Sequence, residues 1–320
     1  MAGRVSLINS VIMGQLMYSF QVYKWLTVFL KDLTSSIRNF LWSGSSKTTK
    51  PIVASWKMCC KSKDNGGLGL RDPIVLNAAL LKKLAWSLMT LESFVFRFLR
   101  GRFFSKGFTP RRFWKSSIWC GLRNHIQTLI DESIWAVGRN SKVHFWTGNW
   151  LGSPLTSLIS YSDNLEPSID AVIGDVTSDF DWSLPASFVS SFPQIADDIR
   201  NTVISDSDTL IWRHSVSGSV TCADSYTSLA GVTSKERWGS KFWASFIPPS
   251  RSLVFWRLLQ NKLSTEKNLI RRGFLCHRAA AFVFLMRKML STFSLVVNLL
   301  LPFGVLSLRL FREEFAWMAP

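Results

Sequence analysis

The chain has 320 residues and a formal net charge of +17, so it has room for about two domains with buried cores. A hydrophobic content of 47%, with 15 Trp and 24 Phe, excludes an intrinsically disordered chain. Five cysteines without a pairing pattern argue against a secreted disulfide scaffold, and the first residues lack the pattern of a signal peptide. We expect a nuclear or cytoplasmic location if the protein is soluble.

The charge is spread unevenly along the chain. Residues 1–150 hold 22 Lys/Arg and 6 Asp/Glu, residues 151–234 hold 2 and 11, and residues 235–320 hold 14 and 4. A basic first half beside an acidic centre indicates that one part of the chain faces a polyanion. Nucleic acid is the obvious polyanion, because Lys and Arg that neutralise phosphates release counterions. An ordinary soluble basic surface is the alternative.

The apolar spacing predicts mainly helices in the first half of the chain. Residues 5–41 favour an antiparallel helix pair, with the second helix around 27–42. Residues 73–101 predict one or two helices, and residues 118–137 predict another. Residues 142–146 are a short strand candidate.

The second half predicts fewer regular elements. Residues 151–207 are rich in Ser, Asp and Pro and favour an acidic, loop-rich linker with short helices near 169–174 and 187–204. Residues 209–214 alternate as a strand, and a turn at Ser217–Gly218 predicts pairing with 219–221 in a β-hairpin. Helices are expected after it. The predicted fold class is mainly α with a small β-hairpin element (α+β), and the later helices are expected at residues 222–229, 251–260 and 264–272.

One stretch joins a basic loop to an amphipathic helix. The segment from Lys57 to Lys63 leads into Gly66–Gly69, where glycines permit positive φ and close backbone approach. Asp72 is placed to cap the next helix, with Pro73 at its first position. The apolar positions from Ile74 onward have helical spacing and leave Lys82 and Lys83 at the helix edge. A structural turn followed by a core helix is the alternative to a binding function.

Arginines and aromatic residues alternate between residues 97 and 115. This pattern suits phosphate pairing combined with base stacking, although Arg side chains covering the edges of an aromatic core would give the same pattern. Together the two stretches predict a nucleic-acid-binding set made up of Lys57, Lys61, Lys63, Lys82, Lys83, Arg100, Arg102, Arg111 and Arg112.

Several of these segments resemble one family. Trp56, Cys59, Gly66–Leu70 and Asn77–Lys82 resemble the segment that follows the polymerase domain in plant non-LTR (LINE-type) retrotransposon reverse transcriptases. The resemblance covers roughly residues 2–277. Further similar segments are Leu7–Val11, Phe40–Gly44, Trp135–Gly138, Phe145–Leu151, Thr209–Trp212, Ser225–Tyr226 and Phe255–Arg257.

The resemblance implies four regions. They are a basic helical thumb- or connection-like region at 1–150, an acidic linker at 151–207, a partial reverse-transcriptase zinc-binding-like module at 208–278 and an atypical apolar tail at 279–320. The family's zinc site needs a Cys-x-x-Cys pair followed by His and Cys, in a tetrahedron. Cys276 matches its first ligand, but no Cys follows Cys276 and no His follows His277. We therefore expect no metal and no cofactor, with Cys276 as a lone remnant ligand.

The resemblance also implies chemistry that this sequence lacks. The family's polymerase holds two Mg²⁺ on a Tyr-x-Asp-Asp turn, which is absent here, and Asp197–Asp198 is the only Asp pair. A ribonuclease H centre needs several converging carboxylates, and the basic regions contain few. His125 and His144 stand alone without metal-ligand spacing. We expect a non-catalytic remnant of the polyprotein, beginning after the polymerase palm, that contacts RNA or DNA non-specifically.

The tail from residue 279 has a different composition, without Asp and rich in Phe, Leu and Val. Our hypothesis is that it is translated out of frame relative to the ancestral element. The alternative is a membrane anchor, since residues 289–308 carry no charge and follow Arg287 and Lys288. A non-functional or structural product that adheres to a membrane is the corresponding alternative function.

Overall fold

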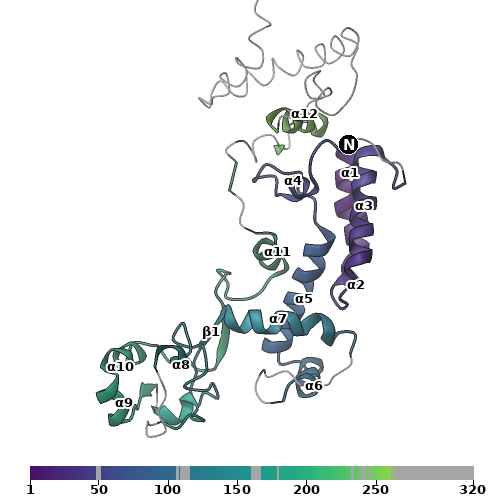
Figure 1. Ribbon diagram of the computed structural model, residues 1–320. Coiled ribbons are helices and arrows are strands. Elements are labelled where there is room, and N and C mark those ends of the chain that lie inside the picture. Colours follow the sequence, from purple (N-terminus) through teal and green to yellow (C-terminus); the bar gives the residue numbers. More distant parts are fainter. Residues whose placement is uncertain are drawn as a thin grey trace, which may run out of the picture. The chain divides into compact units, whose positions relative to one another are not determined.

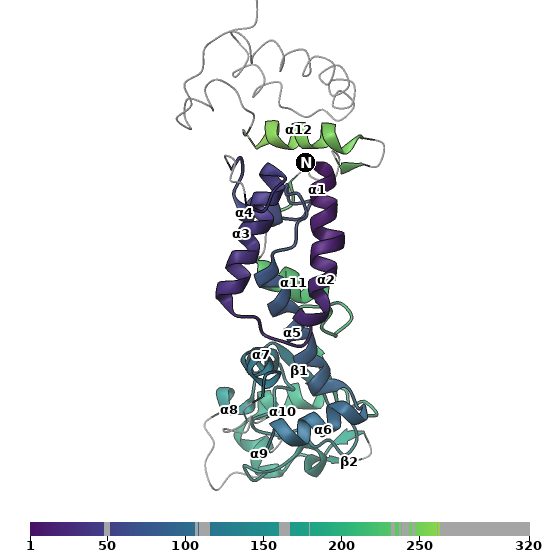
Figure 2. The same ribbon diagram turned by 90° about the vertical axis from the view of Figure 1, so that its right-hand side faces the viewer.

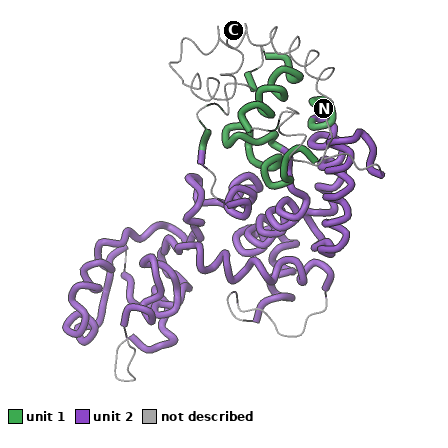
Figure 3. Tube along the Cα trace, turned by 45° about the horizontal axis from the view of Figure 1, so that its top comes forward, with its two compact units in different colours: residues 1–5, 50–69, 235–320 green, residues 6–49, 70–234 purple. Residues whose placement is uncertain are grey.

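The computed structural model describes residues 1–47, 52–105, 108, 116–159, 167–178, 180–231, 234–236, 238, 243–244, 247–260 and 262. Helices dominate this part of the chain, and its strands form two short antiparallel pairs (Figure 1). The predicted class, mainly α with a small β element, is confirmed. The chain divides into two compact units (Figure 3): unit 1 comprises residues 1–5, 50–69 and 235–320, and unit 2 comprises residues 6–49 and 70–234.

The first helices follow the predicted pair closely. Helix α1 (Ala2–Leu7), the π-helical turn η1 (Ile8–Ile12) and α2 (Met13–Phe20) form one rod, and α3 spans Thr27–Ser43. In two perpendicular views η1 and α2 lie beside α3 (Figures 1 and 2). Helix α3 ends because Gly44 adopts a left-handed conformation with φ 89°.

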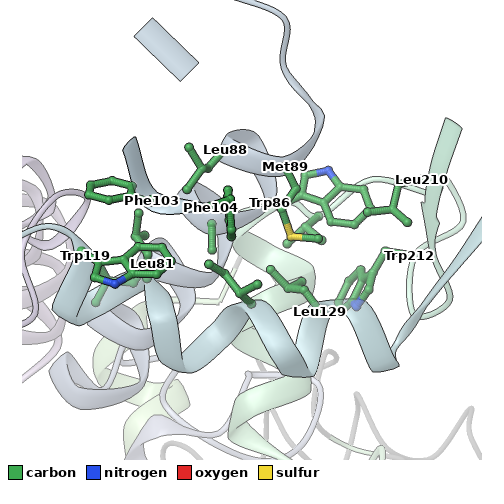
Figure 4. Packing of buried hydrophobic residues seen from close by; sticks show 14 residues of the cluster. Leu81, Trp86, Leu88, Met89, Phe103, Phe104, Trp119, Leu129, Leu210 and Trp212 are labelled. Atoms are coloured by element: carbon green, nitrogen blue, oxygen red, sulfur yellow. The ribbon is translucent and has the colours of Figure 1, made fainter. Parts of the chain in front are cut away.

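Helix α5 (Pro73–Thr90) is the centre of unit 2. Its start is the predicted cap: the Ile74 amide donates to Asp72 Oδ1 at 2.8 Å, and Pro73 occupies the first turn. Helices α6 (Phe94–Phe103) and α7 (Trp119–Asp131) pack against α5. Figure 4 shows the resulting core, in which side chains of α5 meet those of α7 and of the strand β4 (Thr209–Trp212). Its largest members are Trp86, Phe103, Phe104, Trp119 and Trp212.

The small sheet has a different pairing from the predicted one. Helix α7 ends at Asp131, and residues 133–136 form strand β1 (Ser133–Ala136) instead of continuing the helix to residue 137. Strand β4 pairs with β1, with Ser133 opposite Trp212. Residues 219–221 form no strand, so the predicted hairpin partner is wrong, although the Trp212 amide donates to the Gly218 carbonyl at 2.8 Å across the predicted turn. Alternating burial in β4 was readable from the sequence, but alternation does not name the neighbouring strand.

The acidic region is more than a linker. Helices α8 (Leu155–Leu158), α9 (Ala186–Ser191) and α10 (Pro193–Arg200), the 3₁₀ turn η2 (Ile173–Val176) and the strand pair β2 (Thr177–Ser178) with β3 (Asp181–Trp182) surround a second hydrophobic core. Trp146, Trp150 and Phe188 are buried in this core. The predicted strand at 142–146 is not regular; it contributes an isolated bridge between His144 and Val172.

Helix α11 (Cys222–Ala230) matches its predicted bounds and packs along α5. The Thr221 side chain caps its first turn by accepting from the Asp224 amide at 3.1 Å. The Tyr226 hydroxyl accepts from the Asp72 amide at 2.9 Å. Helix α11 therefore contacts the start of α5 as well as its side.

Unit 1 contains α4 (Trp56–Cys60), the glycine turn and α12 (Pro249–Leu259). Gly66 and Gly69 have the predicted positive φ, at 76° and 68°. Trp256 Nε1 donates to the Gly66 carbonyl at 2.8 Å, which anchors the turn to α12. The predicted helix at 264–272, Cys276 and the tail at 279–320 lie outside the described residues.

Within the part of the chain that the structure describes, no single helix has the length and apolar character to cross a membrane. Helices α5 and α6 together meet that test by length and composition, with a bend of 95° between them.

Candidate nucleic-acid interface

Helix α6 presents two different faces. Its start is set by Ser93, whose hydroxyl accepts from the Phe96 amide at 3.5 Å. Phe96 and Leu99 pack against the core, and Phe103 is fully buried there. Residues one turn apart share a helix face, so the positions between these three point away from the core.

The outward face of α6 combines aromatic side chains with arginines. Phe94 is 78% exposed and Phe98 is 58% exposed. Arg97 and Arg102 are also exposed and lie on either side of that pair around the helix. The helix itself contains no acidic residue. An exposed aromatic pair flanked by cations is one form of the Arg–aromatic alternation seen in the sequence, and α6 carries it at Phe94 and Phe98, which the sequence analysis did not single out.

Arg100 has a different position from its neighbours. It donates to Glu92 Oε1 at 2.7 Å and to the Met89 carbonyl at 3.2 Å. Its side chain is only partly exposed. These contacts fix the guanidinium beside the end of α5, so Arg100 stabilises the junction of α5 with α6.

Lys82 is buried, which corrects the prediction that it lies at the exposed edge of α5. Its side chain is 2% exposed, and its Nζ lies 2.7 Å from Glu132 Oε2. The ammonium also lies 5.0 Å from the centroid of the Trp212 ring, and Trp212 Nε1 donates to the same Glu132 oxygen at 3.0 Å. We call Lys82, Glu132 and Trp212 the buried charge cluster. This cluster joins α5 to the end of α7 and to β4, and its Lys82 is too buried to contact a phosphate.

The electrostatics of this cluster follow from its contacts. Burial raises the pKa of the Glu132 carboxyl, but the hydrogen bonds from Lys82 and Trp212 and the positive charge of Lys82 outweigh it, so the pKa is lowered from its ordinary value of 4.5. The pKa of His125 is lowered from its ordinary value of 6.5, mainly by burial and to a smaller extent by the positive charges of Lys82 and Lys24. Glu132 is therefore ionised and His125 neutral at neutral pH.

Lys83 is exposed, and so is Arg71, a cation that the sequence prediction omitted. Burial raises the pKa of the Cys222 thiol, while the charges of Arg71 and Lys83 lower it, so both cations lie near that thiol. Lys24 is a second omission: it is exposed, and its Cβ lies 3.3 Å from the position of a Cβ built on Gly121 of α7. For both Arg71 and Lys24, the signal available in the sequence was their position: Arg71 directly precedes the predicted cap at Asp72, and Lys24 lies next to a predicted helix.

The predicted lysines of the basic loop belong to unit 1. Lys57 and Lys63 are exposed, and Lys61 is partly exposed. The Lys61 carbonyl accepts from the Gly69 amide at 2.9 Å, so its backbone closes the glycine turn. Lys63 Nζ lies 5.1 Å from the centroid of the Trp243 ring. These three cations are therefore arranged around one turn whose conformation is fixed.

The remaining predicted residues, Arg111 and Arg112, lie outside the described residues. Among the residues that are described, no group of three or more His, Cys, Asp or Glu side chains is placed to hold a metal ion. Cys59, Cys60, Cys120 and Cys222 do not form disulfides. Burial raises the pKa of Cys59 to about 12.

Two relatives from Arabidopsis thaliana are similar to this chain. The first, named "Putative ribonuclease H protein", is 24% identical over 295 residues, which cover 85% of this chain and 46% of that protein. The second, named "Uncharacterized mitochondrial protein", is 29% identical over 145 residues, which cover 42% of this chain and 90% of that protein. The match therefore spans less than half the length of the first relative. No family model and no solved structure matches the chain.

Proposed function

We propose that this chain is a non-catalytic remnant of a retrotransposon reverse transcriptase polyprotein that binds RNA or DNA non-specifically through its basic N-terminal half. The two Arabidopsis relatives support a plant retrotransposon-related origin, in agreement with the resemblance seen in the sequence. LINE-type ancestry and a degenerate zinc-binding module belong to the proposal.

One observation carries the binding function: most of the cations in residues 1–150 that the structure describes are exposed, whereas Lys82 is buried and Arg100 is only partly exposed. Exposed members include Lys57, Lys63, Lys83 and Arg102. Two of the six acidic residues of this half, Glu92 and Glu132, are paired with Arg100 and Lys82, so these pairs take up two cations and leave the excess of positive charge in place. The unbalanced charge therefore remains available to phosphates.

The experiment is a salt titration of binding between the full chain and a fluorescein-labelled DNA duplex. We expect the logarithm of the binding constant to fall linearly with the logarithm of the salt concentration. The triple variant K57A/K83A/R102A should reduce that slope by about 2 to 3, because each phosphate contact contributes about 0.9 in B-form duplexes. A matched control is R200A, which removes an exposed arginine from the acidic region and should leave the slope unchanged.

Ribonuclease H activity is the second candidate, favoured by the name of the first relative. That chemistry requires carboxylates converging on two metal ions about 4 Å apart. We propose that it is absent from this chain because the basic regions of the sequence have few carboxylates. Cleavage of the RNA strand of an RNA–DNA hybrid by the purified chain with Mg²⁺ would refute the non-catalytic part of the proposal without affecting the binding part.

A further inference from the structure

The outward face of α6 carries an inference that rests on the proposed function and narrows its substrate. Phe94 and Phe98 are one helical turn apart, so their side chains occupy one stripe of the helix surface. Large aromatic side chains with such exposure lose the free energy that burial of their rings would give. A partner with apolar flat faces would recover it.

The charge around this stripe identifies the chemistry of that partner. Arg97 and Arg102 flank the two rings, and α6 contains no acidic residue. A Cβ built on Gly101, which follows Phe98 by three positions, meets no atom within 4 Å, so space beside the rings is open. The face therefore offers π surfaces between cations, which fits a chain of flat bases joined by phosphates.

We propose that α6 is a stacking platform for single-stranded nucleic acid, in which unpaired bases stack on Phe94 and Phe98 and Arg97 and Arg102 contact the phosphates. In a duplex the faces of the bases are already stacked on each other, and only the backbone and groove edges are accessible. The platform therefore distinguishes single strands from duplexes, whereas the remaining surface cations bind both.

The buried face of α6 makes this platform rigid. Phe96, Leu99 and Phe103 anchor the helix in the core, and Arg100 ties it to Glu92 and to the end of α5. The stacking side chains are thus held on a fixed element, which reduces the conformational entropy lost on binding.

The test compares the wild-type full chain with F94L/F98L on two fluorescein-labelled probes, an oligo-uridine single strand and a mixed-sequence RNA duplex. Leucine keeps the apolar character and favours the helix, but it removes the π face. The matched control is F29L on α3, because Phe29 is 58% exposed, the same fraction as Phe98. Circular dichroism confirms that all variants are folded.

We expect F94L/F98L to weaken single-strand binding by about tenfold or more and duplex binding by less than about twofold. F29L should leave both affinities unchanged. Equal loss on both probes, or loss on neither, overturns the platform, and in that case a wild-type chain that still binds with a steep salt dependence leaves the proposed function standing. Binding of the wild-type chain to phosphatidylserine vesicles but to neither RNA probe refutes both proposals, and loss of that vesicle binding in F94L/F98L assigns the face to a lipid surface.

Discussion

Removing the negative member of the buried charge cluster should destabilise unit 2. The substitution Glu132→Gln keeps the size of the side chain but leaves the Lys82 ammonium, 2% exposed, without a counter-charge. Breaking a fully buried ion pair costs about 3–5 kcal/mol. Glu132 is 26% exposed, so water screens part of this interaction, and we expect about 2–3 kcal/mol, or a melting temperature lower by about 5–10 °C.

A double-mutant cycle separates the pair from its surroundings. Lys82→Met replaces the buried cation by an apolar chain of similar length, and the Glu132 carboxylate keeps its hydrogen bond from Trp212. We expect this change to cost about 1 kcal/mol and K82M/E132Q to be more stable than E132Q alone, with a coupling of about 2 kcal/mol. Urea unfolding followed by circular dichroism measures all four proteins.

The cycle has a clear refuting result. If the free energy of unfolding of E132Q lies within about 0.5 kcal/mol of the wild-type value, Lys82 is not confined beside Glu132 in the folded protein. Lys82 would then count among the exposed cations that can contact phosphate, and the conclusion that it is buried would be wrong.

Three further predictions concern acid, thiols and glycines. Because the folded pKa of Glu132 lies below its ordinary 4.5, its contribution to stability is present above pH 4.5 and is lost as the pH falls through the folded pKa, so E132Q should flatten the acid limb of an unfolding curve measured against pH. At about pH 8, Cys120 should react with iodoacetamide while buried Cys59 remains unmodified in the folded protein, as peptide mass spectrometry would show, and equal labelling would contradict its burial. Gly67→Ala should destabilise unit 1 by more than about 2 kcal/mol, because the new Cβ would overlap the backbone carbonyl oxygen of Lys61. Gly101→Ala should be neutral or stabilising by up to about 1 kcal/mol. Thermal unfolding followed by circular dichroism compares the two variants, and equal effects would show that the glycine turn can relax.

Local signals predicted the helices well. The cap at Asp72 and Pro73 and the 3.6-residue spacing after it placed α5, and similar spacing placed α3. The conformations of Gly66 and Gly69 also followed from residue type. These features depend on neighbours within a few positions, so the sequence contains what determines them.

Long-range contacts were not predictable in the same way. The partner of β4 lies more than seventy residues earlier, and an alternating pattern does not specify it. Lys82 was placed at the surface because α5 was treated as covered on one side, whereas α7 and α11 cover it from two directions. Glu132, fifty residues away along the chain, then supplies the charge that makes burial of Lys82 tolerable.

Composition was misleading for the acidic region. Exposed carboxylates such as Asp197 and Asp198 dominate its sequence and suggested an open linker. Its core combines Trp146 and Trp150, which precede the region, with Phe188 and with aliphatic residues such as Ile173 and Ile199. For the candidate site, the sequence identified the Arg–aromatic alternation of α6 but not which side chains face outward. That depends on how α6 packs against α5.

The central claim is that the cationic half of the chain binds phosphate backbones. Equilibrium binding of the purified full chain to RNA, measured by fluorescence anisotropy from about 50 to 200 mM salt, tests it most directly. The account predicts measurable affinity at the lowest salt and a loss of several hundred-fold or more across this range if six or more phosphates are contacted. Absence of binding at the lowest salt, or an affinity that does not change with salt, would contradict it.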